Sequence, residues 1–163
     1  MNEKICYIYT DGCCLGNNQK DLSKRFGGYA YVLKYNGHEL VKSGGETQTS
    51  NNRMELMAVI KALESCKPEF TGKYIVITDS KYVGGAIKEW LANWMSNGWR
   101  TANRKPVENK DLWQQYVEIS KGKTIEWQWI EGHTGHPENE RCDSLAKEAA
   151  AKIVSSPVYQ TTA

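Results

Sequence analysis

The sequence lacks the features that mark membrane, fibrous or disordered proteins. It has no apolar run long enough to span a bilayer, and its N-terminal segment lacks the apolar stretch of a secretory signal. It shows no internal repeat, no low-complexity tract and only four prolines. With 40% hydrophobic and 25% charged residues, the 163-residue chain has the composition of a globular protein. We therefore predict a single domain over residues 1–154, followed by a flexible tail over 155–163.

The cysteine pattern and the net charge exclude some classes of protein but do not indicate a function. The five cysteines contain no C-x-x-C pair, which argues against a zinc site, and their odd number predicts reduced thiols in a cytoplasmic protein. The 21 basic and 19 acidic residues give a net charge of +2, which is too small to indicate a partner. This excess is local: residues 88–111 hold five basic and three acidic side chains, and all six Trp lie between positions 90 and 129.

The order of secondary-structure patterns predicts an α/β domain. β-branched and aromatic residues, with Asn36-Gly37 as a hairpin turn, predict five strands, over 4–10, 29–35, 38–43, 73–78 and 124–130. The first strand is expected to end at Asp11-Gly12 and the third at Gly44-Gly45. The hairpin requires an antiparallel part of the sheet, and helical crossovers require a parallel part. The fold class is thus a mixed five-stranded sheet with flanking helices.

Helical patterns fill the intervals between these strands. Leu56, Ile60 and Leu63 are spaced as on one helical face, with Asn52 as the predicted cap. Residues 82–119 predict two or three short helices that are broken around Gly98 and Pro106. A last helix is expected to open at position 137 or 138 and to run to about Ile153.

Four carboxylates are expected to converge on one edge of the sheet. Asp11 and Asp79 follow two strands that would be parallel neighbours, and ligands bind at that edge in open α/β sheets. Glu55 and Asp143 lie about 100° around their helices from Leu56 and Cys142, on the rim of each buried face. Each has a purely structural alternative: a turn at Asp11, a helix cap at Asp79, a capping box that includes Glu55, or a favourable helix-dipole position for Asp143.

Taken together, the four carboxylates predict a cation site. Converging carboxylates repel one another unless a cation lies between them. Oxygen ligands without Cys or a His cluster favour Mg²⁺, with Mn²⁺ as a substitute. Two such ions about 4 Å apart would bind the attacking and leaving oxygens of a phosphodiester.

Five blocks of sequence resemble type 1 ribonuclease H, in that family's order. They are TDGCCLGN at 10–17, NNRMEL at 51–56, TDSKYV at 78–83, the stretch from Trp90 to Trp113, and GHTGHPENERCDSLA at 132–146. The resemblance covers about residues 4–152. It implies the ribonuclease H-like fold and cleavage of the RNA strand of RNA–DNA hybrids by two metal ions, leaving 3′-hydroxyl and 5′-phosphate ends.

The resemblance also assigns the catalytic residues. The carboxylates Asp11, Glu55, Asp79 and Asp143 fall on the family's metal ligands, and His133 falls on its mobile-loop histidine. An imidazole titrates near neutral pH, which suits a group that transfers a proton or helps the product phosphate leave. The structural alternative for His133 is a solvated loop residue.

The resemblance further predicts the residues that bind the hybrid. The RNA 2′-hydroxyl, the group that distinguishes RNA from DNA, would lie near Cys14, Asn17 and Asn51, and Glu55 could accept a hydrogen bond from it. On the DNA strand we predict contacts from Ser50, Trp94 and Asn109. The predicted set is completed by Lys81, Trp99, Arg100, Arg104 and Lys105. Core packing is predicted for the other tryptophans, Trp90, Trp113, Trp127 and Trp129.

Several positions depart from the family pattern. The 17–27 loop is several residues longer than is usual in bacterial members and adds Lys20, Lys24 and Arg25. Gln48 stands where many members have Arg, and Lys81 where Gln is common. None of these changes touches a carboxylate, so they bear on affinity and strand preference. No obligate protein partner is indicated, and we expect a monomer.

Two other functions stay open at the level of sequence. One is a DNA-cutting relative on the same fold, such as an integrase or transposase, although those keep fewer of the five blocks. The other is a catalytically dead hybrid-binding module, against which the four intact carboxylates argue. Cleavage assays on hybrid, RNA duplex and DNA duplex distinguish the three.

Overall fold

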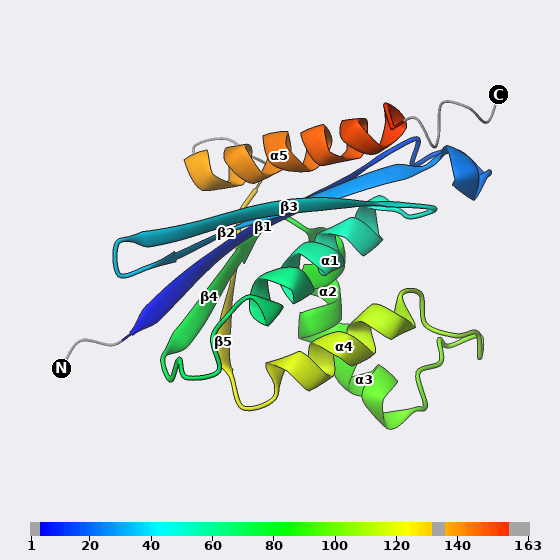
Figure 1. The fold of residues 1–163 in the computed structure, drawn as a ribbon. Coiled ribbons are helices and arrows are strands. Elements are labelled where there is room, and N and C mark those ends of the chain that lie inside the picture. Colours follow the sequence, from blue (N-terminus) through cyan, green and yellow to red (C-terminus); the bar gives the residue numbers. More distant parts are fainter. Residues whose placement is uncertain (1–3, 132–135, 157–163) are drawn as a thin grey trace.

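A mixed five-stranded sheet forms the centre of the molecule (Figure 1). The computed structural model describes residues 4–131 and 136–156. Along the sheet the strands lie in the order β3-β2-β1-β4-β5. Their bounds are β1 (Ile5–Leu15), β2 (Phe26–Tyr35), β3 (His38–Thr47), β4 (Lys73–Thr78) and β5 (Thr124–Trp129). β1 pairs antiparallel with β2 and parallel with β4, so the predicted mixed sheet is confirmed.

Helices cover both faces of this sheet. The helices are α1 (Asn51–Glu64), α2 (Lys81–Gly85), α3 (Leu91–Ser96), α4 (Lys110–Ser120) and α5 (Pro137–Val154), with a 3-10 turn over Leu22–Lys24 and a π-helical segment over Ala86–Trp90. α5 lies alone on one face, and α1 to α4 lie on the other (Figure 1). The predicted break between the helices around Gly98 and Pro106 is confirmed, because residues 97–109 separate α3 from α4.

Two apolar clusters fill the layers between sheet and helices. The larger cluster joins β1, β2 and β4 to α1 and α4, and Ile8, Leu56, Ile60 and Trp113 are among its fully buried members. The smaller one joins Ala30 and Val32 of β2 to Cys142 and Ala146 of α5. α1 and α5 are thereby fixed on opposite faces of β1 and β2.

Three local predictions were wrong. β1 continues through Asp11-Gly12 to Leu15, because this half of the strand pairs with β2. β3 likewise continues through Gly44-Gly45 to Thr47, which pairs with Phe26. The cap of α1 is Ser50 rather than Asn52: the Ser50 hydroxyl accepts a hydrogen bond from the Arg53 amide at 3.1 Å.

The tryptophans divide differently from the prediction. Trp113 is fully buried and Trp127 packs against the larger cluster, as expected. Trp129 is half-buried and stacks on Trp127 with ring centroids 5.7 Å apart. Trp90 is 41% exposed, so its predicted core position was wrong. The π-helical segment ends at Trp90.

Within residues 4–131 and 136–156, the helices are too short or too polar to cross a bilayer. α5 ends at Val154, as predicted. Of the predicted tail, residues 155 and 156 follow α5, and the remainder lies outside the described residues.

Candidate active site

Strand register places Asp11 and Asp79 side by side. The β1–β4 ladder ends at the pair Tyr9 and Ile77, and each aspartate lies two residues further along its strand direction. Beyond this pair β1 stays in the sheet through its bonds to β2, whereas β4 gives way to the Ser80 cap of α2. Asp11 is 5% exposed and Asp79 is half-buried. The prediction that the two carboxylates share one sheet edge is thus confirmed.

Gly12 brings the third carboxylate to the same place. A Cβ atom at Gly12 would overlap the backbone of Met54 and Glu55, so α1 can approach β1 this closely only beside glycine. The carboxylate oxygens of Asp11, Glu55 and Asp79 lie within 4.8 Å of one another, an arrangement that could hold a metal ion. These three come from a strand, a helix and the end of another strand.

Asp143 reaches the cluster from the opposite face of the sheet. It lies in the second turn of α5, next to Cys142, whose thiol is 3.5 Å from the carbonyl of Tyr9. Its carboxylate is close enough to raise the pKa of Asp11. Lys147, one turn further along α5, forms an ion pair with Asp143 at 2.9 Å. All four predicted carboxylates are therefore neighbours.

The electrostatics of this cluster fit a cation. Burial raises the pKa of Asp11 to about 8, and the charges of Asp79 and Asp143 add to that rise. One Asp11 oxygen accepts the Gly12 amide at 2.9 Å, while the other is buried and has no hydrogen-bond donor among the described residues. This buried oxygen, which receives no hydrogen bond, lies among other carboxylates. Carboxylate oxygens are the ligands that Mg²⁺ and Mn²⁺ prefer.

A second set of predicted residues gathers at the start of α1. The Asn17 side chain accepts a hydrogen bond from the Asn51 amide at 2.9 Å, and Ser50 caps the same helix. The Cys14 thiol lies 3.8 Å from the carbonyl of Thr49. Cys14, Asn17, Ser50 and Asn51, which lie up to 37 positions apart, thus form one polar cluster, which we call the α1 cluster.

The long 17–27 loop contributes a cation to the α1 cluster. The Arg25 guanidinium donates to the carbonyls of Gln19 at 2.8 Å and Thr49 at 3.4 Å. Its own carbonyl accepts the amide of Gln48, which has a positive φ of 54°. Arg25 therefore lies beside Gln48, at the segment that leads into α1.

Three more predicted residues, Trp94, Trp99 and Asn109, lie near α3 and α4. Asn109, which has a left-handed backbone, donates to the Tyr82 hydroxyl at 3.2 Å and accepts from Arg53 at 3.4 Å. Trp94 is half-buried with its ring centroid 6.0 Å from that of Trp113, and Trp99 also packs against the larger core cluster. Much of both indole rings is thus occupied by packing.

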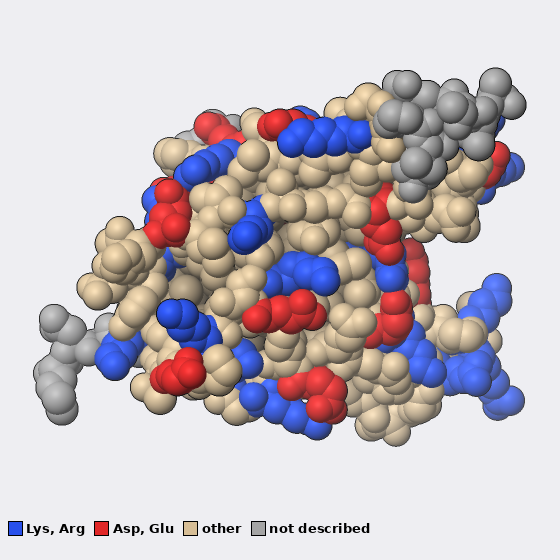
Figure 2. Space-filling model, in the orientation of Figure 1, with Lys and Arg blue, Asp and Glu red and all other residues tan. Residues whose placement is uncertain are grey.

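A basic protrusion extends from this region. Arg100, Arg104 and Lys105 are exposed on the loop between α3 and α4, and Arg100 pairs with Pro106 in an isolated β-bridge. Figure 2 shows Lys and Arg side chains projecting where that loop leaves the body of the molecule. Lys81 is exposed at the start of α2 and lines a cavity with Asp79. His133 lies outside the described residues.

Sequence reasoning missed two contacts that support the site. Arg53 forms an ion pair with Asp111, which joins α1 to α4. Asn139 is 2% exposed on α5, and its amide is 3.5 Å from the carbonyl of Ile77. The Asn139 contact could not be found from sequence, but the buried position of an amide on an apolar helix face was visible in the spacing from Cys142.

The relatives of this chain carry the same family name. The RNase H family model matches residues 3–151. Ribonuclease H of Escherichia coli O127:H6 (strain E2348/69 / EPEC) is 51% identical over 143 residues, which are 88% of this chain and 87% of that protein. Ribonuclease H of Enterobacter sp. (strain 638) is 47% identical over 154 residues, 94% of each protein.

Solved structures agree with the sequence comparisons. LC9-RNase H1, described as a type 1 RNase H with the type 2 active-site motif, matches with a TM-score of 0.77 at 27% identity, over 98% of this chain and 85% of that one. The prototype foamy virus protease-reverse transcriptase matches with a TM-score of 0.74 at 26% identity, over 90% of this chain and 21% of that one. Because the family model covers residues 3–151 and relatives about half identical to this chain cover most of its length, this chain belongs to the RNase H family.

Proposed function

We propose that this protein is a metal-dependent endonuclease that hydrolyses the RNA strand of RNA–DNA hybrids and leaves 3′-hydroxyl and 5′-phosphate ends. The observation that carries the proposal is the convergence of Asp11, Glu55 and Asp79 oxygens within 4.8 Å, around a buried Asp11 oxygen that has no donor among the described residues. The catalytic domain spans residues 1–154, and the free cysteines are consistent with a reducing cytoplasm.

The carboxylates Asp11, Glu55, Asp79 and Asp143 would hold two Mg²⁺ ions, for which Mn²⁺ can substitute. When bound, such ions lower the pKa of a water nucleophile and stabilise charge on the attacking and leaving oxygens of a phosphodiester. The chain itself supplies rigidity: β1 and β4 fix Asp11 and Asp79 through the sheet, and Gly12 fixes Glu55 through close packing of α1. Because strands and helices already hold these carboxylates in place, little conformational entropy is lost when they bind the ions and the substrate.

The α1 cluster would contact both strands of the hybrid: the 2′-hydroxyls of the RNA strand and a phosphate of the DNA strand. Cys14, Asn17 and Asn51 lie next to the catalytic end of α1, where Glu55 can also accept a hydrogen bond from a 2′-hydroxyl. Ser50 would contact a DNA phosphate, and Arg25 supplies positive charge beside it. These polar groups select for hybrid, because a DNA strand at this position leaves them without the hydroxyl.

The protrusion would bind the DNA strand further from the reacting phosphate. Arg100, Arg104 and Lys105 are exposed cations suited to phosphates, and Lys81 lies nearer to Asp79. The packing of Trp94 and Trp99 leaves part of each ring for sugar contacts, and Asn109 accepts a hydrogen bond from Arg53 of α1. His133 would assist proton transfer or product release. The enzyme acts as a monomer and needs no membrane or protein partner.

Cleavage assays with three substrates test the proposal. In Mg²⁺, labelled RNA–DNA hybrid should be cut in its RNA strand alone, while RNA duplex and DNA duplex stay intact. Asp79→Asn keeps the side chain's shape but removes a ligand charge, and we expect the rate to fall at least about a hundredfold with the fold unchanged. DNA cleavage would favour the transposase-like alternative. Hybrid binding without cleavage by the wild type would favour the binding module.

A further inference from the structure

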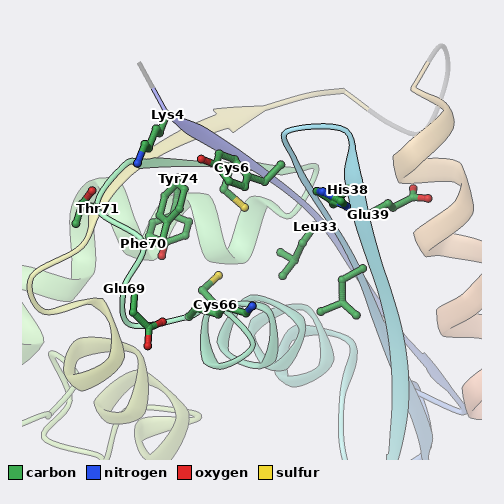
Figure 3. Close-up of a pocket in the computed structure, with 13 residues that line it drawn as sticks. Lys4, Cys6, Leu33, His38, Glu39, Cys66, Glu69, Phe70, Thr71 and Tyr74 are labelled. Carbon is green, nitrogen blue, oxygen red and sulfur yellow. The ribbon is translucent and has the colours of Figure 1, made fainter. Parts of the chain in front are cut away.

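A cavity at the far end of the sheet from the carboxylates contains two cysteines. It has a volume of about 540 Å³ and lies at the amino ends of β1 and β4, beneath the β2–β3 turn. Cys6 reaches it from β1, and Cys66 reaches it from the segment that follows α1. In Figure 3 both sulfur atoms point into the cavity and toward one another. The function proposed above uses neither residue.

The two thiols line the same cavity and face each other, but they differ in exposure. Cys6 is 6% exposed and belongs to the larger core cluster, whereas Cys66 is half-buried at its edge. The Cys66 thiol also lies 3.4 Å from the carbonyl of Ala62. The rim of the cavity carries the exposed side chains of Lys4, Lys67 and Glu69, so a small polar molecule can reach Cys66 from solvent.

The surroundings of the pair favour one thiolate. The hydrogen bond from Cys6 lowers the pKa of Cys66, and the Tyr74 hydroxyl and the charge of Lys123 act in the same direction. The same contact with Cys66, together with burial, raises the pKa of Cys6. Cys66 is also the more exposed of the two thiols, so it is the nucleophile of the pair, and the buried Cys6 is the neighbouring thiol. A reactive, accessible thiol beside a second thiol is the arrangement that senses oxidants.

The other three cysteines lack this arrangement. Burial raises the pKa of Cys13 to about 11 and that of Cys142 to about 12, and it also raises the pKa of Cys14. Cys142 is fully buried in the smaller cluster. Cys13 and Cys14 are adjacent on β1, and successive side chains of a strand point to opposite faces. We therefore expect an oxidant to react with Cys66 before the other cysteines.

We propose that Cys66 and Cys6 form a reversible oxidation site for hydroperoxides. The Cys66 thiolate attacks one peroxide oxygen, the O–O bond breaks, and hydroxide or alkoxide leaves to give a sulfenic acid. The Cys6 sulfur then attacks the Cys66 sulfur, the S–O bond breaks, and the hydroxyl group leaves as water with the Cys6 proton. The peroxide gains two electrons, the two thiols lose two, and a disulfide joins β1 to the end of α1.

Peptide mapping of the folded protein tests this assignment. Hydrogen peroxide should produce a monomer lighter by two hydrogen atoms, and dithiothreitol should restore its mass. Trypsin then yields linked peptides 5–20 and 62–73, provided that cleavage fails before Pro68. Peptide 5–20 carries three cysteines, so the mapping uses the variant with Cys13→Ala and Cys14→Ala, in which the link must be Cys6 to Cys66. The linked protein should melt roughly 5–10 °C higher than the reduced one.

Single variants separate the two roles. Cys6→Ala, an apolar replacement in a core position, should leave a sulfenic acid on Cys66 that dimedone traps in higher yield than in wild type. Cys66→Ala, at a half-buried position, should leave Cys6 unmodified. The proposal is overturned if dimedone labels Cys14 before Cys66, or if the Cys6–Cys66 link forms only in urea. Mapping of the variant with Cys13→Ala and Cys14→Ala decides this even if Cys6→Ala fails to fold, and none of these outcomes depends on nuclease activity.

Discussion

Arg53 and Asp111 face each other in a two-bond ion pair across the gap between α1 and α4. The guanidinium nitrogens lie 3.0 Å from Asp111 Oδ1 and 2.7 Å from Oδ2. Glu46 also contacts Arg53 at 3.3 Å. The pair lies two residues from Glu55 on one side and two residues from Asn109 on the other. It therefore couples the position of the carboxylate cluster to the base of the protrusion.

The strength of this pair can be measured by a double-mutant cycle. We expect Arg53→Ala and Asp111→Ala to show a coupling of about 0.5–1 kcal/mol in urea unfolding, since the geometry is bidentate but the Asp111 side chain is 59% exposed. The Glu118–Lys121 pair, at 2.7 Å but exposed on both sides, serves as the control and should couple more weakly. Strict additivity of the Arg53 and Asp111 changes would contradict the expectation.

The raised pKa of Asp11 predicts a pH-dependent stability of the metal-free protein. Its folded-state pKa of about 8 lies above the usual aspartate pKa of about 3.8, so between these pH values the folded state holds a proton that the unfolded chain releases. The free energy of unfolding should therefore fall as pH rises from about 4 to 8, by at most about 1.4 kcal/mol per pH unit from this group. Thermal melts in a chelator measure it.

Asp11→Asn provides the matched control for those melts. The amide cannot titrate, so its profile should be flatter than that of the wild type, and the variant should be the more stable protein at pH 8. Mg²⁺ should stabilise the wild type at pH 8 and have little effect on the variant. Parallel profiles for the two proteins would show that Asp11 ionises normally.

The protrusion should contribute affinity rather than rate. Replacing Arg100, Arg104 and Lys105 with Ala should raise KM for a hybrid roughly tenfold or more and leave kcat nearly unchanged, because uniform binding is lost. The log–log salt slope of binding should flatten by up to about three units. Trp94 is left intact because it packs on Trp113, so replacing it would change the stability of the protein as well as hybrid binding.

A charge-matched variant checks that the protrusion result is local. Lys42, Lys121 and Lys152 are exposed on β3, after α4 and at the end of α5. Changing these three to Ala alters the net charge by the same amount. An equal rise in KM from this control set would mean that overall charge, not the protrusion, governs hybrid binding.

Gly12→Ala should damage both the fold and the site. The added methyl group meets the backbone of Met54 and Glu55, which cannot move like the end of a flexible side chain. We expect a loss of roughly 1–3 kcal/mol of stability, with a lower affinity for Mg²⁺ in the fraction that folds. Gly122→Ala, where a Cβ meets nothing within 4 Å but φ is 76°, should cost about 1–2 kcal/mol and leave Mg²⁺ affinity unchanged. Isothermal titration separates the two.

Sequence alone predicted that Asp11 and Asp79 lie close together. Local residue patterns mark where each strand ends, and parallel neighbouring strands end at the same edge of the sheet. The same patterns misjudged the extent of β1. Asp11-Gly12 has the composition of a turn, and only the register with Ala30 and Tyr29 of β2 keeps it in the sheet. A partner strand outweighed local preference.

Contacts between distant segments were beyond sequence reasoning. Arg53 and Asp111 lie 58 positions apart, and nothing in either segment signals the other. In the run Ser50-Asn51-Asn52, three adjacent residues can each cap a helix, and the backbone decides in favour of Ser50. Trp90 has the apolar character of a core residue but lies at the end of the π-helical segment, on the surface.

The carboxylate cluster also has a consequence for synthesis of the chain. Its members are drawn from β1, α1, the end of β4 and the second turn of α5, so they are spread over residues 11–143. A polypeptide still attached to the ribosome holds Asp11 and Glu55 long before Asp143 emerges, and β1 cannot pair with β4 until residue 77 is available. Products that end before Asp143 should therefore lack the complete set of carboxylates, so the intact site can form only after α5 has been synthesised.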